Sequence, residues 1–323
     1  MIGAGRWAPR LAAATQRAGL RIVTNYNRDP ETRAAFAERF GSEAAPSLEA
    51  AIEHPEVEGV MLVTPNDMHA DQAIACAARG RHVFVEKPIA DTIAAGERMR
   101  DARLAAGVVL MVGHSFRRLG AARRTRELID EGRLGRVVLA EANFSVVGTL
   151  PPTAWRAHRE RNPGGPIMQL GIHHVDTLRS WLGPVARTTG RMAHVHTDAD
   201  IDDVGVVTME FASGALGVLT GSYVSPHTFS LRLLGTDAVL DLRVDLGRCW
   251  PDAERVEEFT TLTVAGEPEP FEPRDMLAEE LAEFGAAIRG EGAVETGAEE
   301  GLAALGVVLD AAAGRAAAPA AAV

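Results

Sequence analysis

The sequence predicts an α/β Rossmann-type domain with a doubly wound parallel sheet, followed by an α+β domain with a large, mostly antiparallel open sheet. Three observations support this prediction. The chain has 323 residues, which is long for one compact core. Residues 1–118 alternate short β-branched runs with helical patterns. Residues 119–323 contain long β-patterned runs separated by Gly, Ser and Asp turns.

In the first domain, four apolar runs predict strands that are buried on both faces of a parallel sheet. These runs cover residues 20–27, 57–66, 81–88 and 108–116. Between them, Ala-rich segments with one charged face predict helices that end at a glycine, as helices commonly do. The segments are residues 30–41, 69–80 and 90–107.

In the second domain, a basic helix precedes the β-patterned runs. The helix covers residues 121–135, the runs cover 136–147, 204–225 and 228–244, and helices over 274–290 and from Glu299 close the domain. We expect the basic segment from Arg117 to Arg126 to be a solvated helix face without a phosphate-binding role. The Ala-rich tail, residues 311–323, should fray because Pro319 cannot continue a helix.

Composition excludes several classes of protein. A net charge of −11 argues against a binder of nucleic acid or of an anionic membrane, because such partners need a basic face. The sequence has neither a signal-peptide pattern nor an apolar run of about 18 residues, which predicts a cytoplasmic protein. Cys76 and Cys249 are far apart and lack metal-ligand spacing, which indicates a reducing compartment and no disulfide framework.

Gly3, Gly5 and Ala8 form the pattern G-x-G-x-x-A, which after a strand is the fingerprint of a dinucleotide-binding turn. A glycine turn before an ordinary helix is the alternative. Only Met1 and Ile2 precede the pattern, so the first strand is nearly absent: either it is a stub, or the natural start lies upstream. We favour the upstream start, and a chain extended by a few upstream codons should then melt at a higher temperature.

The adenosine end of the cofactor is expected at Asn27 and Arg28, about 20 residues after the fingerprint, where an acid normally binds the ribose. Asn27 is uncharged, and the guanidinium of Arg28 can pair with a 2′-phosphate, so NADP is favoured over NAD. Asp29 keeps NAD open, because a register shift of two residues would bring its carboxylate to the ribose.

Short motifs in a fixed order carry a resemblance to a known family. In the first half they are GAGRWA (3–8), VTPNDMH (63–69), EKPIA (86–90) and GHSFRR (113–118). In the second half they are EGRLGRV (131–137), WR (155–156), GG (164–165) and GIHHVD (171–176). Together they resemble the glucose–fructose oxidoreductase / inositol dehydrogenase / rhizopine-catabolism (Gfo/Idh/MocA) family of NAD(P)-dependent oxidoreductases.

The resemblance implies which residues bind the cofactor. In relatives the loop at residues 64–66 lies along the nicotinamide side, although a strand-ending Pro-Asn turn would explain this sequence without a ligand. The implied cofactor-binding residues are Gly3, Gly5, Arg6, Trp7, Ala8, Asn27, Arg28, Thr64, Pro65, Asn66, His69, Glu86 and Lys87.

Lys87 is the first predicted catalytic residue. It follows an apolar strand run and precedes Pro88, so its amine is held near the carboxyl edge of the sheet, partly desolvated and suited to proton transfer. The family uses this lysine at the reacting hydroxyl. We expect Glu86 to bind the cofactor or orient Lys87, and Pro88 to fix the turn, with a cis bond as one possibility. A solvated lysine at a strand end is the alternative.

His173 is the second predicted catalytic residue, in the stretch PGGPIMQLGIHHVD at residues 163–176. The glycine pair permits a close turn, and a helix is expected to follow as far as Gly183. Gln169, His173 and Asp176 are spaced i, i+4 and i+7, so on a helix they share one face. His174 points about 100° away and is expected to be a bystander. We expect Asp176 to cap or brace the helix.

Gln169 departs from the family, because relatives usually carry an aspartate at this position. The glutamine can orient an imidazole or a hydroxyl, but it cannot act as a base or counter-ion. A zinc site at the adjacent histidines is not supported, since their side chains diverge and no third ligand has suitable spacing, so we predict no metal. The predicted substrate-binding residues are Lys87, Trp155, Arg156, Gln169 and His173, with His158 and Arg159 as weaker candidates.

The family implies hydride transfer between the nicotinamide and a secondary alcohol or ketone of a sugar, inositol or sugar derivative. Two alternatives remain. One is transient oxidation that eliminates or hydrolyses a glycosidic bond and regenerates the cofactor. The other is a catalytically silent NADP(H)-binding protein, which the missing aspartate and the short first strand would suit. The expected partners are the small-molecule substrate and further copies of the chain, in a homodimer or homotetramer formed through the second-domain sheet.

Overall fold

The structure, a computed structural model, describes residues 1–148, 150–151, 153–249 and 255–314. The chain forms two compact units. The first consists of Met1–Ser115 and Met276–Ala303, and the second of Phe116–Asp275 and the segment from Ala304. The expected fraying tail lies outside the described residues from residue 315 onward. Among the described residues, no helix has both the length and the apolar composition needed to cross a bilayer.

The parallel sheet of the first unit confirms the Rossmann-type prediction. Two strands, β1 (Thr24–Asn25) and β2 (Glu43–Ala44), pair in parallel, as do β3 (Gly59–Leu62), β4 (His82–Glu86) and β5 (Leu110–Gly113). A single residue, Ile2, makes parallel bridges to Tyr26 and Leu62. The spatial order is therefore β2, β1, Ile2, β3, β4, β5, with Ile2 at the position of the expected first strand.

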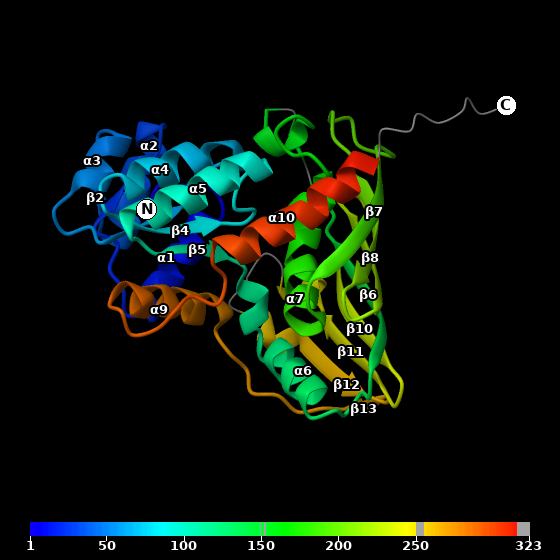
Figure 1. Cartoon of the computed structure of the whole chain (residues 1–323). Coiled ribbons are helices and arrows are strands. Elements are labelled where there is room, and N and C mark those ends of the chain that lie inside the picture. Colours follow the sequence, from blue (N-terminus) through cyan, green and yellow to red (C-terminus); the bar gives the residue numbers. More distant parts are fainter. Residues whose placement is uncertain (149, 152, 250–254, 315–323) are drawn as a thin grey trace. The chain divides into compact units, whose positions relative to one another are not determined.

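Helices cover both faces of this sheet. They are α1 (Ala8–Arg17), α2 (Pro30–Phe40), α3 (Leu48–Glu53), α4 (His69–Ala77), α5 (Ile93–Ala106) and α9 (Met276–Ile288). Figure 1 shows α4 and α5 on one side of the parallel strands and α1 and α9 on the other. The three predicted helices are confirmed, and Gly41 and Gly107 end α2 and α5 in the left-handed conformation that glycine favours. Two short elements, α3 and β2, were not predicted because six and two residues show no clear periodicity.

The division of the chain differs from the predicted one. The first unit ends at Ser115 rather than residue 118, and it includes Met276–Ala303, which the sequence prediction placed in the second domain. The apolar face of α9 explains this difference, because it packs on the parallel sheet. The rings of Phe284 and Phe84 lie 5.9 Å apart, and Gly59 on β3 leaves room for the Phe284 ring. The second division falls within α10 (Ala298–Ala313).

The second unit contains the predicted open sheet. Its eight strands are β6 (Val137–Ser145), β7 (Val185–Ala193), β8 (Val204–Phe211), β9 (Leu216–Ser222), β10 (Thr228–Gly235), β11 (Val239–Val244), β12 (Thr260–Val264) and β13 (Glu267–Pro268). They follow the order β13-β12-β11-β10-β6-β9-β8-β7. Every neighbouring pair is antiparallel except β6 and β9. The edge strand β7 was not predicted, because its sequence, VARTTGRMA, does not alternate apolar and polar residues.

The sheet buries one face and leaves the other exposed. On β8, Val207 and Met209 are buried, whereas Val206 and Thr208, which alternate with them, are exposed, as expected for a strand with one covered face. Two helices, α6 (Gly120–Asp130) and α7 (Ile172–Leu182), lie along the same face of the sheet in Figure 1. Their apolar residues and the buried face of the sheet form the core of the second unit.

Candidate active site

The fingerprint turn has the geometry that a dinucleotide requires. Gly3 has φ of +88°, and a Cβ on this residue would lie 2.6 Å from the carbonyl oxygen of Val63, so any side chain is excluded. A Cβ on Gly5, by contrast, would meet no heavy atom within 4 Å. Ala8 is fully buried at the start of α1. The chain thus turns tightly at Gly3 and leaves open space at Gly5, where a pyrophosphate can approach the backbone.

A hydrogen bond connects this turn to the strand that precedes Lys87. The indole Nε1 of Trp7 donates to Oε1 of Glu86, at 2.8 Å. Glu86 is the last residue of β4, and Lys87 follows it in a turn whose Lys87–Pro88 bond is cis, as the sequence prediction allowed. Lys87 itself is half-buried. The contact with Trp7 was not predicted, because it joins residues 79 positions apart in the chain.

His69 holds two loops at the same edge of the sheet. Its Nδ1 lies 3.0 Å from the carbonyl oxygen of Pro88, and its Nε2 lies 2.9 Å from that of Thr64. The ring is buried, and burial lowers the pKa of His69. The imidazole therefore connects the loop after β3 to the turn that carries Lys87, and the predicted cofactor-binding loops are fixed relative to each other.

Asn66 provides a polar group next to these loops. It is buried, and its Nδ2 has no hydrogen-bond partner among the described residues. Buried amide groups normally have a partner, and a bound ligand can supply one. Together with the turn at Gly3 and the open approach at Gly5, Asn66 fits the predicted dinucleotide site.

The predicted adenosine end contains one cation that the sequence analysis missed. Arg28 is exposed after β1, as expected. Asp29 is the N-cap of α2: its carboxylate accepts hydrogen bonds from the side chain and the backbone of Thr32, which lower the pKa of Asp29. Arg33 donates from Nη1 to the carbonyl oxygen of Asn27 at 3.0 Å, and its guanidinium lies over the ring of Tyr26. Two arginines thus lie near the end of β1.

In the second unit, the predicted α-helical register around Gln169 is wrong. Residues Ile167–Gly171 form a π-helical turn directly before α7, which runs from Ile172 to Leu182. A π-turn closes one residue later than an α-turn, so Gln169 does not lie one α-helical turn before His173. The glycine turn is confirmed: Gly165 has φ of +51°, and a Cβ there would lie 2.1 Å from the carbonyl oxygen of Asp202.

Gln169 belongs to a ring of hydrogen bonds with Arg156 and Asn162. Its Oε1 accepts from Nε of Arg156 at 3.3 Å, and its Nε2 donates to Oδ1 of Asn162 at 3.0 Å. Nδ2 of Asn162 donates to the backbone carbonyl of Arg156 at 3.1 Å. Gln169 and Asn162 are buried, whereas Arg156 is exposed, with its guanidinium over the ring of Trp155. The structure thus brings together the predicted substrate residues Trp155, Arg156 and Gln169.

The two adjacent histidines have different surroundings, as predicted. His173 is half-buried, and its ring meets the edge of Phe116 with centroids 4.7 Å apart. His174 is fully buried beside Phe144 and Phe229, and its Nε2 lies 3.1 Å from the carbonyl oxygen of Asn143. Burial lowers the pKa of His174 to about 4, so this ring is a neutral core residue at physiological pH.

Asp176 braces α7, as expected, but its partner corrects another prediction. Nε and Nη2 of Arg117 donate to the two carboxylate oxygens of Asp176 at 2.6 and 2.7 Å. The two side chains are only 9% and 1% exposed. Arg118 is also buried. The segment that starts at Arg117 is therefore not a solvated helix face throughout: residues Ser115–Arg118 form a 3₁₀ turn whose arginines point into the protein.

The two weaker substrate candidates lie in the loop that follows Trp155. His158 is exposed. Arg159 is half-buried, and its guanidinium lies 3.7 and 3.6 Å from carboxylate oxygens of Asp200 and Asp202. Arg159 therefore pairs with residues of its own unit, which favours a structural role.

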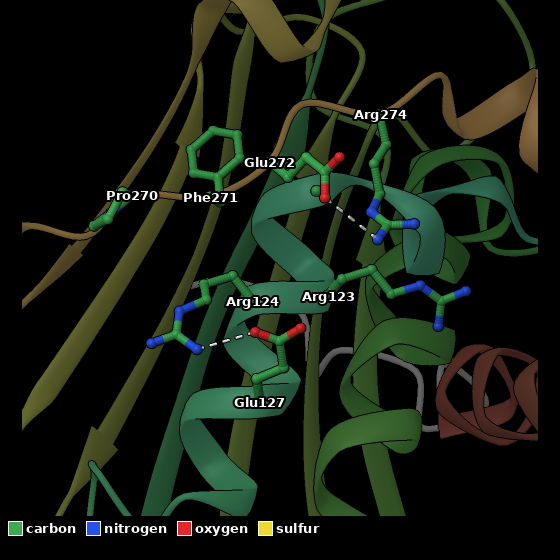
Figure 2. A pocket seen from close by; sticks show the side chains of 8 residues that line it. Arg123, Arg124, Glu127, Pro270, Phe271, Glu272 and Arg274 are labelled. Carbon is green, nitrogen blue, oxygen red and sulfur yellow. Dashed lines mark hydrogen bonds and ion pairs between the residues drawn. The ribbon is translucent and has the colours of Figure 1, made fainter.

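A surface cavity of about 460 Å³ lies elsewhere in the second unit, between α6 and residues 270–274 (Figure 2). None of the predicted site residues lines it. Arg124, at its edge, contacts Glu127, Glu131 and Glu269, which raise the pKa of the guanidinium above its usual range. Figure 2 also shows Arg274 directed toward Glu272. Since these arginines already face carboxylates, the cavity is not the candidate active site.

One signal for Lys87 was overlooked in the sequence. Lys87 is the single lysine of the chain, and the other 32 of its 33 basic Lys and Arg residues are arginines. Arginine keeps its proton at any physiological pH, whereas a lysine amine can release and take up a proton. A single lysine at residue 87, in a chain that otherwise uses arginine, agrees with the predicted role of Lys87 in proton transfer.

Comparison with known proteins agrees with this geometry. Residues 1–114 match the family model described as the oxidoreductase family with an NAD-binding Rossmann fold, and residues 122–241 match the GFO/IDH/MocA C-terminal domain. The chain belongs to the Gfo/Idh/MocA family. It is therefore an oxidoreductase of the NAD(P)-dependent type, and the resemblance that the sequence motifs predicted is confirmed.

Three relatives illustrate the family. This oxidoreductase is 30% identical to 1,5-anhydro-D-fructose reductase of Ensifer adhaerens over 94% of the chain and 91% of the relative. It is 30% identical to D-xylose 1-dehydrogenase (NADP(+)) 2 of Haloferax volcanii over 81% of the chain and 79% of the relative. A crystal structure of a putative NADPH-dependent oxidoreductase from Desulfitobacterium hafniense is 34% identical, with a TM-score of 0.90, over 97% of this chain and 93% of that one.

Proposed function

We propose that this oxidoreductase transfers a hydride between NADP(H) and a secondary alcohol, or the matching ketone, of a sugar, inositol or sugar derivative. The observation that carries the proposal is the single lysine at the end of β4, beside the Trp7–Glu86 hydrogen bond and the His69 brace. Two relatives named for reactions on sugars support the substrate class.

In the proposed reaction, the bound nicotinamide gives or accepts the hydride, and the protein moves the hydroxyl proton and fixes the orientation. Lys87 acts as general acid or base at the substrate oxygen. His173 is its partner at the same hydroxyl. Trp155 and Arg156 contact the substrate, and Gln169 holds Arg156 without taking part in proton transfer.

The test is a panel of sugars, inositols and sugar acids supplied with NADP and NAD separately, with reduced nicotinamide followed by its absorbance. The proposal expects net cofactor reduction with at least one member. Product formed without net reduction would instead indicate transient oxidation with loss of a glycosidic bond. Tight NADPH binding with no product from any member would indicate a silent cofactor-binding protein, and the proposal would be wrong.

The preference for NADP is expected to depend on Arg28 and Arg33 together. Replacing both with methionine should weaken NADP binding by about 10- to 100-fold, because charge-assisted hydrogen bonds to the 2′-phosphate would be lost. NAD binding should change little. Titration calorimetry with each cofactor measures both affinities. Arg39→Met removes a guanidinium from the last turn of α2, the helix that carries Arg33, and is the matched control. Equal loss for NADP and NAD would contradict the assignment.

We propose that the exposed face of the eight-stranded sheet joins copies of the chain in a homodimer or homotetramer. Leu216, Leu139, Leu234 and Val239 are aligned across four neighbouring strands of this face, and Leu216 is 52% exposed. An apolar row on an exposed sheet face is typical of a protein interface. Leu216→Glu should shift the mass measured by light scattering toward the monomer, whereas Leu104→Glu, at an exposed leucine of α5, should not. An unchanged mass for the Leu216 variant would refute this interface.

A further inference from the structure

The two neighbours of Lys87 in the chain are each held by a different part of the predicted cofactor site. Glu86, which precedes the lysine, accepts a hydrogen bond at 2.8 Å from the indole of Trp7, in the fingerprint turn. Pro88, which follows it, has its carbonyl oxygen 3.0 Å from Nδ1 of His69, at the start of α4. These contacts reach across 79 and 19 residues, so the turn that carries Lys87 is braced on both sides.

Trp7 makes the first brace with a side chain that its own helix does not use. Trp7 is the N-cap of α1, and its side chain makes no capping hydrogen bond, since an indole has no acceptor for the backbone N–H groups of the first turn. Its N–H instead meets a carboxylate, which is a stronger acceptor than a neutral group. Gly113 on β5 leaves room for that carboxylate, because a Cβ there would lie 3.4 Å from Oε1 of Glu86. The fingerprint turn is thereby tied to the end of β4.

His69 makes the second brace and connects it to the loop after β3. Its Nε2 lies 2.9 Å from the carbonyl oxygen of Thr64, and the Thr64 hydroxyl donates to Oε1 of Gln72 at 2.6 Å, so two residues of α4 hold this loop. The ring is only 1% exposed. Both ring nitrogens face carbonyl oxygens, which can only accept, so a ring with one N–H bonds one loop at a time and a doubly protonated ring bonds both. Replacing the imidazole removes the brace in either case.

We propose that Trp7 and His69 are positioning residues for Lys87, which fix the place of its amine relative to the cofactor loops. This inference rests on the proposed function, and it adds two residues that act on proton transfer through the lysine. A general acid or base works only within hydrogen-bond reach of the proton that it moves. A displacement of about 1 Å can lower the rate about 100-fold, so loss of either brace is felt at the substrate hydroxyl.

The first test needs no substrate. Incorporation of ε-¹³C-lysine labels Lys87 alone, and its NMR signal is recorded in protein saturated with NADPH. Trp7→Phe keeps an aromatic ring but removes the N–H, and we expect it to shift or broaden the lysine signal while NADPH still binds. His69→Phe removes both ring nitrogens and should do the same. Trp181→Phe makes the same chemical change in α7 of the second unit and should leave the signal in place.

The second test uses a substrate from the panel and asks whether Trp7 acts through the lysine. Trp7→Phe should lower kcat by about 10- to 100-fold in the native protein. In the Lys87→Met background the same change should have little further effect on kcat, because the group that Trp7 positions is already absent. His69→Phe is expected to follow the same pattern.

The outcomes separate a positioning role from a purely structural one. An unchanged lysine signal in a folded variant, or equal fold-losses of kcat with and without Lys87, would overturn the role of the residue replaced. Weaker NADPH binding as the sole effect would do so as well. If melting shows that His69→Phe does not fold, Trp7→Phe decides, because Trp7 is only half-buried. Absence of turnover across the panel would remove the proposed reaction, whereas the NMR signal would still decide whether the two residues position Lys87.

Discussion

Replacing Lys87 with methionine is expected to lower kcat by about 10²- to 10⁴-fold, the usual contribution of a positioned acid or base, without weakening NADPH binding. Methionine keeps an unbranched side chain, one atom shorter than that of lysine, and has no proton to transfer. The neighbouring Trp7–Glu86 and His69 contacts do not involve the lysine amine, so the cofactor half of the site should persist. Absorbance assays measure kcat, and nucleotide fluorescence measures the affinity for NADPH.

Lys87→Arg separates charge from proton transfer. Arginine keeps the positive charge but cannot release its proton, so this variant should be as inactive as the methionine variant. Substantial activity in Lys87→Arg would mean that only charge is needed at this position, and activity in both variants would remove Lys87 from the mechanism. Because the chain has one lysine, incorporation of ε-¹³C-lysine labels Lys87 alone. Its single NMR signal should shift when NADPH is added.

The sequence was sufficient for the fold wherever an element is long and apolar. The strands β3 to β5 and the helices α2, α4 and α5 follow directly from apolar runs and helical periodicity. The edge strand β7 was not predicted because its sequence, VARTTGRMA, does not alternate apolar and polar residues, and strands of two residues are too short to show any periodicity. The membership of α9 in the first unit depends on contacts such as Phe84 with Phe284, which join residues 200 positions apart and leave no local pattern.

For the candidate site, residue identities were readable but pairings were not. The motifs were sufficient to select Gly3, Lys87 and His173 as candidate site residues. The structure then showed contacts between residues that are far apart in the sequence, such as the hydrogen bond from Trp7 to Glu86. The π-turn at Ile167–Gly171 is the clearest case, because nothing in its composition distinguishes it from an α-helical turn. It replaces the expected α-helical turn around Gln169, and the contacts of Gln169 with Arg156 and Asn162 could not be read from the sequence.

The ion pair between Arg117 and Asp176 is expected to be the costliest interaction to break in the second unit. Replacing Asp176 with leucine would leave the guanidinium, which is 9% exposed, without this carboxylate, and breaking a buried pair in this way typically costs about 3–5 kcal/mol. For a domain of this size, that loss lowers the melting temperature by roughly 10 °C.

Calorimetry of two further variants tests whether Asp176→Leu destabilises the protein by leaving a buried charge without its partner or simply by loss of packing. The double variant Arg117→Met with Asp176→Leu removes both charges and should recover much of the lost stability, because no buried charge is left without its partner. Arg187→Met breaks the exposed ion pair between Arg187 and Glu210, whose side chains are 70% and 46% exposed. This variant should change the free energy of unfolding by no more than about 1 kcal/mol.

If Asp176→Leu destabilised the protein as little as Arg187→Met, the ion pair between Arg117 and Asp176 would not brace α7. If the double variant were less stable than Asp176→Leu alone, the Arg117 side chain would stabilise the second unit mainly through its packing rather than through its charge.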